Sequence, residues 1–195
     1  MLDEEIRHSL IVTAREEADR LNRLVGNLLD MTRLEAGAIR IHSEASDVQD
    51  LIGSVLEHFE SRLEDHPVRV DLPDDLPLVY FDFVLIGQVL INIVDNALKY
   101  SSSGSPIDID ARLDSGSVEI SVADRGIGIP PGDLAHVFDK FYRVQRPDNV
   151  SGTGLGLSIC KGIVEAHGGS IRAENRPGNG TKITIKLPLG GMKSE

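Results

Sequence analysis

The chain contains 195 residues, and 41% of them are hydrophobic, which is enough for one globular domain with an appendage. Asp and Glu together number 31 against 20 Lys and Arg, and the net charge of −11 disfavours nucleic acid and anionic membrane surfaces as partners. The single cysteine excludes an internal disulfide bond, and no run approaches the roughly 18 consecutive apolar residues that a membrane span requires. We therefore expect the chain itself to be soluble.

The first elements predicted along the chain are a long helix and a short strand. Apolar residues recur at steps of three and four between positions 10 and 34, which is the period of one helical face. These residues are Leu10, Ala14, Ala18, Leu21, Val25, Leu28, Met31 and Leu34. The helix is expected to end near Gly37, before a strand-like stretch at residues 39–41. We assign residues 1–41 to this helix and a linker, 42–190 to one larger domain and 191–195 to a tail.

Helices and strands follow one another through the larger domain. Asp47 is placed to cap a helix that runs to residue 63, Asp82 starts a helix that runs to residue 100, and a third helix is predicted at residues 155–167. At its end, His167 fits a helix C-terminal residue that the helix dipole favours. Strand-like stretches lie at residues 68–72, 78–81, 107–111, 118–122, 170–174 and 182–187, the last four forming two hairpins. The pattern predicts an α+β fold: an α/β sandwich with a mixed, mainly antiparallel sheet and helices on one face, preceded by one long amphipathic helix.

A polar stripe runs along the helix predicted after Asp82. Asn92, Asn96 and Lys99 lie at spacings of i, i+4 and i+7, so they share one side of the helix. Two amides and an ammonium group suit Mg²⁺ and phosphate oxygens. Taken alone, such a stripe is more often a solvated polar face.

A second polar group follows the apolar strand at residues 118–122. Asp124 stands at the end of that strand, where its carboxylate can accept a hydrogen bond from an exocyclic amine. Gly126 and Gly128 allow the backbone to approach a flat base closely. A lone turn with two glycines is more often only a turn.

A third group lies immediately before the helix at residues 155–167. Gly152, Gly154 and Gly156 can expose backbone N–H groups to a phosphate, which the helix dipole also favours. The spacing matches neither a P-loop nor the Rossmann glycine pattern. Upstream, residues 138–150 fit a lid held by Phe138 and Phe141, from which Lys140 or Arg143 can reach phosphates.

Read together and in order, these segments resemble the nucleotide-binding motifs of sensor histidine kinases, which belong to the gyrase, Hsp90, histidine kinase and MutL superfamily. Residues 92–100 resemble the N box, 124–128 the first glycine box, 138–143 the F box, 152–157 the second glycine box and 178–181 a third. The resemblance covers about residues 45–188 and implies a Bergerat-type ATP-binding fold. The stretches DDLPLV, QVLINIVDNALKYSSSGSPI and RLVGNLLDMTRLEAG are most similar to the potassium-responsive sensor kinases.

The resemblance implies roles for individual residues. Asp124 would bind the adenine amino group, with Tyr100, Ile129 and Leu157 lining the base, and Asn92 and Asn96 would serve Mg²⁺. Lys99 and a lid cation, here Arg143, would contact the phosphates. The full set implied for ATP binding is Asn92, Asn96, Lys99, Tyr100, Asp124, Gly126, Gly128, Ile129, Lys140, Arg143, Gly152, Thr153, Gly154, Leu155, Gly156, Leu157 and Thr181.

The implied activity is transfer of the ATP γ-phosphoryl group to a histidine and then to an aspartate of a response regulator. The phosphoacceptor histidine is expected on a first helix absent from this chain, because His8 lacks the neighbouring acid of that motif. Residues 1–41 would then be the second helix of the dimerisation region, and we assign no catalytic residue. The implied partners are a response regulator receiver domain, the phosphoacceptor helix and a second copy of the full-length protein. The implied location is the cytoplasmic portion of a bacterial inner-membrane sensor.

Other functions within the superfamily stay open. A gyrase- or Hsp90-like ATPase uses a glutamate four residues before the Mg²⁺-binding asparagine, but that position is Asn92 here, and an amide cannot act as a general base. A related serine kinase is disfavoured by the long first helix. A nucleotide-binding regulatory module without catalysis is the remaining alternative.

Overall fold

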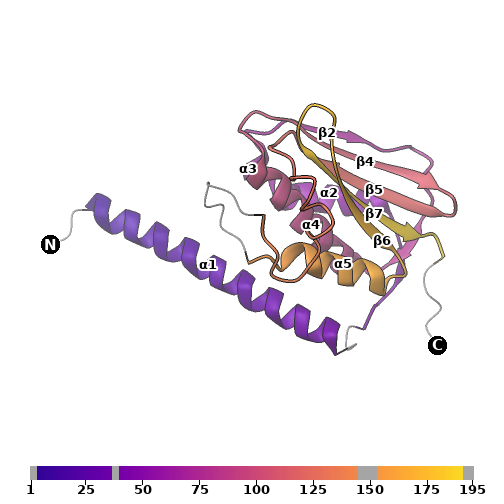
Figure 1. Cartoon of the computed structure of the whole chain (residues 1–195), viewed down its shortest axis with the longest axis horizontal. Helices are drawn as coiled ribbons and strands as arrows, with labels where there is room; N and C mark the ends of the chain where they lie inside the picture. Colours follow the sequence, from indigo (N-terminus) through magenta and orange to yellow (C-terminus); the bar gives the residue numbers. More distant parts are fainter. Residues whose placement is uncertain (1–3, 37–39, 145–152, 191–195) are drawn as a thin grey trace.

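The structure is a computed structural model that describes residues 4–36, 40–144 and 153–190. Figure 1 shows a twisted sheet with helices packed on one face and one long helix extending away from the domain. In chain order the elements are α1 (Glu4–Glu35), β1 (Glu44–Ser46), α2 (Val48–His58), α3 (Glu60–Leu63), β2 (Val68–Asp71), β3 (Val79–Phe81), α4 (Phe83–Tyr100), β4 (Ile107–Asp114), β5 (Ser117–Ala123), α5 (Gly156–Ala166), β6 (Ser170–Asn175) and β7 (Thr181–Pro188).

The main sheet has the strand order β2-β4-β5-β7-β6, in which β2 runs parallel to β4 and the other neighbours are antiparallel. Alternate residues of the central strands point to opposite faces. Ile109, Ile120 and Ile185 are buried on the face that the helices cover. Charged residues occupy the opposite face, where Arg172 donates two hydrogen bonds to Glu119 across β7. The predicted α+β sandwich is confirmed.

A two-residue turn joins β4 to β5. Ser115 and Gly116 both have positive φ, 48° and 81°, and Asp114 pairs with Ser117 on either side of them. Two consecutive positive φ angles define the type I′ geometry that matches the twist of an antiparallel hairpin. The predicted hairpin therefore forms with a tight turn.

A second, two-stranded sheet was not predicted. β1 pairs antiparallel with β3, so that Ala45 lies opposite Tyr80. The strand expected at residues 39–41 is wrong where the structure describes it, because Arg40 and Ile41 belong to no strand. The chain reaches its strand partner only at Glu44.

Asp82 joins three parts of the molecule at the start of α4. Its Oδ1 accepts hydrogen bonds from the backbone N–H groups of Val84 and Leu85, both at 3.1 Å, and caps the helix as predicted. Its Oδ2 accepts the backbone N–H of His42 at 3.0 Å. Its own N–H donates to Nε2 of His167 at 3.1 Å. The start of α4 is thus tied to the linker and to the end of α5.

His167 is the C-cap of α5, as the sequence indicated, and its side chain is buried. Its Nδ1 lies 2.7 Å from the Ile163 carbonyl oxygen, while its Nε2 accepts the Asp82 N–H. Only an imidazole with its proton on Nδ1 satisfies both contacts. The expected position of His167 at the C-terminus of the helix is therefore confirmed.

Among the described helices, α4 is long and apolar enough to meet the length and composition criteria for a membrane span. Its apolar side chains, including Ile86 and Ile93, are buried against the sheet and the neighbouring helices. The same criteria are met by the core helix of a globular domain.

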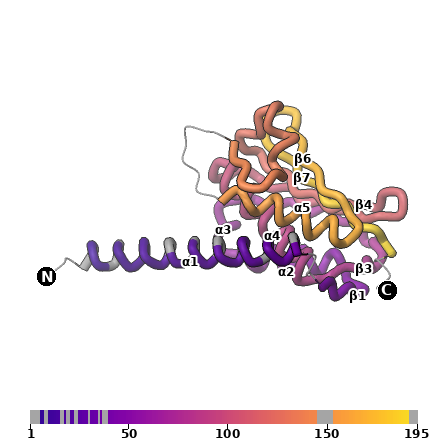
Figure 2. The backbone as a smooth tube through the Cα atoms, turned by 60° about the horizontal axis from the view of Figure 1, so that its bottom comes forward, coloured from indigo at the N-terminus to yellow at the C-terminus, as the bar shows by residue number. Residues whose placement is uncertain are grey.

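α1 is one continuous helix, as predicted, but it begins at Glu4 rather than near residue 10. Its C-terminal part packs on α5, where Met31 is buried and Leu34 lies against Gly162. Toward its N-terminus the helix extends beyond the domain, as Figure 2 shows. Leu10 and Leu21 are exposed there, with 55% and 60% of their surface accessible.

Candidate functional site

Asp124 lies at the end of β5 and is held by backbone groups on two sides. Its Oδ1 accepts hydrogen bonds from the N–H of Gly126 at 2.8 Å and from the N–H of Thr181 at 3.1 Å. Its own N–H donates to the Thr181 carbonyl at 2.9 Å. Asp124 is 7% exposed and Thr181 is 9% exposed, so these bonds are shielded from water. The carboxylate orientation is fixed before any ligand binds.

The loop after β5 packs closely against the end of α4. A side chain at position 126 would come within 2.1 Å of the Tyr100 carbonyl oxygen, so only glycine fits at Gly126. This contact places Tyr100, which is 37% exposed, beside the loop that carries Asp124. Four residues from the predicted set, Tyr100, Asp124, Gly126 and Thr181, therefore meet at one end of the sheet.

Asn175, which the sequence did not single out, holds the far end of the same loop. Its Oδ1 accepts the Ile129 N–H at 2.8 Å, and its Nδ2 donates to the Ile129 carbonyl at 2.5 Å. Gly128, with φ of +70°, directly precedes Ile129 and lies close to the Asn175 side chain. The signal that could have found Asn175 is its position at the end of β6, two residues before the Pro177-Gly178 turn, in register with Thr181.

Asn92, the first residue of the polar stripe of α4, lies close to the start of α5. The Oδ1 atom of Asn92 would lie 3.7 Å from a methyl group placed on Gly156. Asn92 also hydrogen-bonds with the thiol of Cys160, whose burial raises its pKa to about 12 despite that bond. Asn96, one turn later, is half-buried. The N box and the second glycine box are thus adjacent in space at Asn92 and Gly156.

Lys99 is engaged within its own helix. Its Nζ lies 2.5 Å from Asp95, which also receives a hydrogen bond from Arg62 at 2.7 Å. Burial acts to raise the pKa of Asp95, but the hydrogen bonds from Lys99 and Arg62 outweigh it, and the pKa is lowered. Contact between Lys99 and a phosphate would require the ammonium group to leave or share this ion pair.

Residues 131–144, which include the described part of the lid at 138–144, are held by short-range hydrogen bonds. The Tyr142 hydroxyl donates to Asp133 at 2.6 Å, and His136 lies 2.8 Å from Asp139. The expectation that Phe141 anchors this segment is wrong, because its side chain is 66% exposed and its φ is +61°. Val137 is the buried residue instead, and Phe138 is half-buried.

Two backbones cross where the lid meets the start of α5. The Phe141 N–H donates to the Gly154 carbonyl at 3.0 Å, and a side chain at Gly154 would lie 2.8 Å from the Tyr142 oxygen. With φ of +71°, Gly154 also needs the left-handed conformation that glycine adopts without strain. Gly154 is therefore required for the crossing itself.

α5 begins at Gly156 without a side-chain cap in the described part of the chain. Thr153 reaches only the N–H of Leu155, at 3.3 Å, while Leu155 and Leu157 pack on the core. The first N–H groups of the helix are thus not satisfied by a capping side chain, which suits an anionic ligand. Gly152 lies outside the described residues, and Lys140 and Arg143 are exposed on the lid.

Known proteins are similar to this chain in sequence and in fold. A family model described as histidine kinase-, DNA gyrase B-, and HSP90-like ATPase matches residues 81–191. The chain belongs to this ATPase family. It is 40% identical over 174 residues to the sensor protein KdpD of Escherichia coli strain K12, covering 89% of the chain and 19% of that protein.

Two solved structures match the whole chain of this ATPase family member. Full-length ShkA in complex with AMPPNP has a TM-score of 0.81 and 29% identity, covering 100% of this chain and 41% of that one. Histidine kinase ThkA in complex with the response regulator TrrA has a TM-score of 0.79 and 27% identity, covering 100% and 55% respectively. The chain thus spans only part of these proteins, and about a fifth of the KdpD relative.

The donor set of the ATPase domain fits Mg²⁺ only together with a nucleotide. The described residues contain no group of three or more His, Cys, Asp or Glu side chains that could hold a metal ion. Asn92 and Asn96 supply amide oxygens, which are ligands that Mg²⁺ accepts but which carry no charge. Phosphate oxygens would have to complete the coordination.

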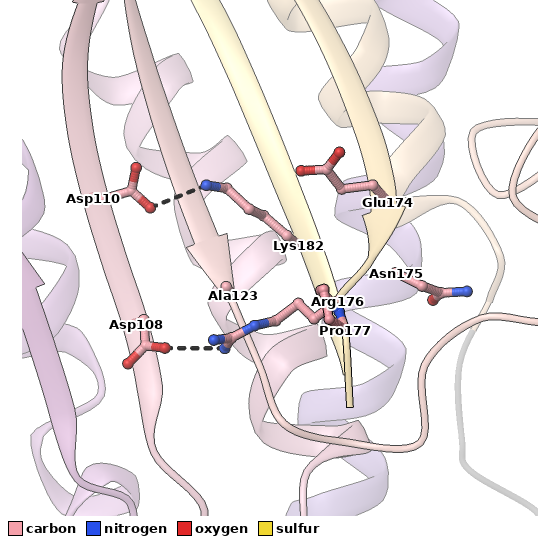
Figure 3. Close-up of a pocket in the computed structure, with 8 residues that line it drawn as sticks. All are labelled: Asp108, Asp110, Ala123, Glu174, Asn175, Arg176, Pro177 and Lys182. Carbon is pink, nitrogen blue, oxygen red and sulfur yellow. Dashed lines mark hydrogen bonds and ion pairs between the residues drawn. The ribbon is translucent and has the colours of Figure 1, made fainter. Parts of the chain in front are cut away.

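A separate pocket of about 340 Å³ lies on the outer face of the sheet, opposite the helices. Figure 3 shows the ion pairs that cross its floor, Asp108 with Arg176 and Asp110 with Lys182. Burial acts to raise the pKa of Asp110, but hydrogen bonds from Ser121 and Arg112 and the charge of Lys182 outweigh it and lower the pKa. This face is therefore a matched ionic surface.

Proposed function

We propose that this chain binds ATP with Mg²⁺ and acts as the catalytic domain of a two-component sensor histidine kinase, transferring the γ-phosphoryl group to a histidine. The observation that carries the proposal is the fixed Asp124 carboxylate, held by the N–H groups of Gly126 and Thr181 beside Tyr100. A buried, oriented carboxylate at the end of a strand suits an exocyclic amino group such as that of adenine. Membership of the ATPase family supports the same assignment.

The other residues then divide between the base and the phosphates. Ile129 and Leu157 line the base with Tyr100, and Asn92 and Asn96 bind the metal and the phosphates. The uncapped start of α5, from Gly154 to Gly156, provides backbone N–H groups for the phosphate chain. Lys99, Lys140, Arg143 and Gly152 complete the site when the lid is over the nucleotide. The AMPPNP bound to the ShkA relative supports a nucleotide at this fold.

In the proposed reaction an imidazole nitrogen of the acceptor attacks the γ-phosphorus. A P–N bond forms, the bond to the β,γ-bridging oxygen breaks, ADP leaves with Mg²⁺, and the imidazole proton passes to a base near the acceptor. Asn92 supports transfer over hydrolysis, because no carboxylate stands at the position where a general base would activate water. The chain's own residues bind, orient and shield the phosphates, which is most of the catalysis that phosphoryl transfer needs.

The partners and the domain assignment are also proposals. We infer that residues 1–41 form the second helix of a dimerisation and phosphoacceptor region, with the catalytic domain at 42–190 and a tail at 191–195. A second copy of the full-length protein and a response regulator receiver domain are the proposed partners, and the complex of ThkA with TrrA supports the latter. The similarity to KdpD supports potassium sensing by the full-length protein, a bacterial inner-membrane sensor of which this chain would be a cytoplasmic portion.

The test has two stages. Calorimetry should show ATP binding that weakens when Mg²⁺ is chelated, at micromolar to millimolar dissociation constants, because an exposed lid leaves much of the phosphate solvated. Equal affinity with and without Mg²⁺ would contradict the roles of Asn92 and Asn96.

In the second stage the chain is incubated with labelled ATP, first alone and then with a phosphoacceptor domain that contains the histidine helix of a KdpD relative. We expect acid-labile label on the acceptor only, and none when the acceptor histidine is replaced by alanine. Stoichiometric label on the chain alone that His8→Ala removes would overturn the assignment of a separate acceptor. ATP binding with no label on any acceptor would favour the regulatory-module alternative. Potassium-independent labelling of the full-length parent would refute only the potassium assignment.

A further inference from the structure

Asn175 makes two hydrogen bonds to the backbone of one residue, Ile129, in the loop after β5. It accepts the N–H of Ile129 at 2.8 Å and donates to the carbonyl of Ile129 at 2.5 Å. The side-chain amide thereby pairs with both backbone groups of a single residue, as a neighbouring strand would. Asn175 is exposed at the surface, so burial does not force this geometry.

Both sides of this contact are fixed by other parts of the site. A methyl group on Gly128 would lie 3.2 Å from the Asn175 Oδ1, so the approach needs a small residue there. Asn175 is paired in register with Thr181, whose N–H bonds to Asp124. Figure 3 shows the Asn175 side chain directed away from the ion pairs of the outer-face pocket.

We propose that Asn175 is a positioning residue of the adenine pocket, holding Ile129 in place for the base. The proposal rests on the function proposed above, in which Ile129 lines the adenine. The loop between Asp124 and Ile129 contains two glycines. Without contacts to restrain it, this flexible backbone would have to be ordered when the nucleotide binds. Asp124 fixes one end of the loop, and Asn175 fixes the other before the nucleotide arrives.

This role has a signature that depends on the ligand. Because Ile129 contacts the base, Asn175→Ala should weaken ATP, ADP and adenosine by the same factor, about tenfold. Asn96→Ala should weaken ATP and ADP in the presence of Mg²⁺ and leave adenosine unaffected. Turnover at saturating ATP should be nearly unchanged by Asn175→Ala, so the effect appears in KM rather than in kcat.

Asn175→Asp gives a second, pH-dependent signature. An ionised carboxylate accepts the Ile129 N–H but offers no donor to the Ile129 carbonyl, so one bond becomes a repulsion. A protonated carboxyl group restores both bonds. The acids that line the adjoining pocket, Asp108, Asp110 and Glu174, are balanced by Arg176, Lys182 and the Arg125 that pairs with Asp108, so the facing Ile129 carbonyl is what favours the protonated form. Adenosine affinity of this variant should therefore recover as the pH is lowered.

The experiment compares the full 195-residue chain with Asn175→Ala, Asn175→Asp and the control Glu174→Gln, which changes the preceding residue of the same strand. Calorimetry with ATP, ADP and adenosine gives the affinities, and thermal unfolding reports whether each variant is folded. We expect equal losses for the three ligands with Asn175→Ala, acid recovery with Asn175→Asp alone, and wild-type affinity with Glu174→Gln.

Three outcomes would overturn the inference. These are unchanged adenosine affinity in folded Asn175→Ala, a loss confined to ligands with phosphates, and an Asn175→Asp profile that parallels the wild-type profile. If Asn175→Ala does not fold, the pH series on Asn175→Asp decides the question. Failure of the wild-type chain to bind ATP would instead refute the proposed function, so the two ideas fail by different results.

Discussion

Replacing Asp124 by asparagine tests the site most directly, because the change removes a charge and keeps the shape. In the folded chain Oδ1 accepts two backbone N–H groups, at 2.8 Å from Gly126 and 3.1 Å from Thr181. An asparagine that turns its carbonyl oxygen toward them keeps both bonds as neutral ones. Hydrogen bonds to a charged acceptor contribute about 1.5–3 kcal/mol and neutral ones about 0.5–1.5 kcal/mol, so the fold should lose about 1 kcal/mol per bond.

The effect on ATP should be larger than the effect on the fold. With its oxygen committed to the backbone, the asparagine presents an NH₂ group toward the adenine amino group, so a charge-assisted bond is replaced by two facing donors. We expect a loss of about 2–3 kcal/mol in binding, or roughly 30- to 150-fold in Kd. Guanine nucleotides, which carry an acceptor at that position, should lose less.

The assay is calorimetry of ATP and GTP binding, with thermal unfolding as the measure of folding. Asp114→Asn is the matched control, because Asp114 stands at the opposite end of the β4–β5 hairpin and pairs with Lys186. Its ATP affinity should equal that of the wild type. A folded Asp124→Asn variant that binds ATP as tightly as the wild type would show that the base lies elsewhere.

Three further predictions concern the structure around the site. Because burial raises the pKa of Cys160 to about 12, its thiol should resist iodoacetamide at pH 8 in the folded chain and react once urea unfolds it. The pKa of Asp95 is lowered in the fold, so its contribution to stability is present above pH about 4 and is lost as the pH falls below that value. Asp95→Asn should therefore be less stable than the wild type at neutral pH. Urea unfolding curves of the two proteins should converge in acid. His167→Leu leaves the N–H of Asp82 without its partner and should lower the free energy of unfolding by about 1–3 kcal/mol. The urea midpoint should fall accordingly. An unchanged midpoint would mean that another group satisfies the Asp82 N–H.

Features set by neighbouring residues were predictable from the sequence. Asp47 and Asp82 cap their helices because a short acidic side chain can reach N–H groups two or three residues ahead. The Ser115–Gly116 turn follows from its length and its glycine. The resemblance to the family assigned Asp124 and Thr181 to one site, and the two residues are hydrogen-bonded in the structure. Their roles toward a nucleotide stay predictions.

Features that depend on distant partners could not be predicted. β1 has no strand pattern of its own and exists because β3 lies beside it. Asn175 lies one residue beyond the strand predicted at residues 170–174, and its partner Ile129 is 46 positions away and uses backbone atoms that any residue would offer. Phe141 has a positive φ because its N–H must meet Gly154, a requirement that an aromatic residue in sequence does not signal.

The two-residue turn between β4 and β5 offers a practical handle on this domain. β5 runs seven residues from the turn to the loop that carries Asp124, so the turn stands about 20 Å from the site. Ser115 and Gly116 are both exposed, and in the described part of the chain the turn backbone meets only the end of β7, through the Leu189 N–H. A fluorophore attached at Ser115 through an introduced cysteine would leave buried Cys160 unlabelled, and energy transfer between it and a fluorescent ATP analogue would report nucleotide binding without altering the site.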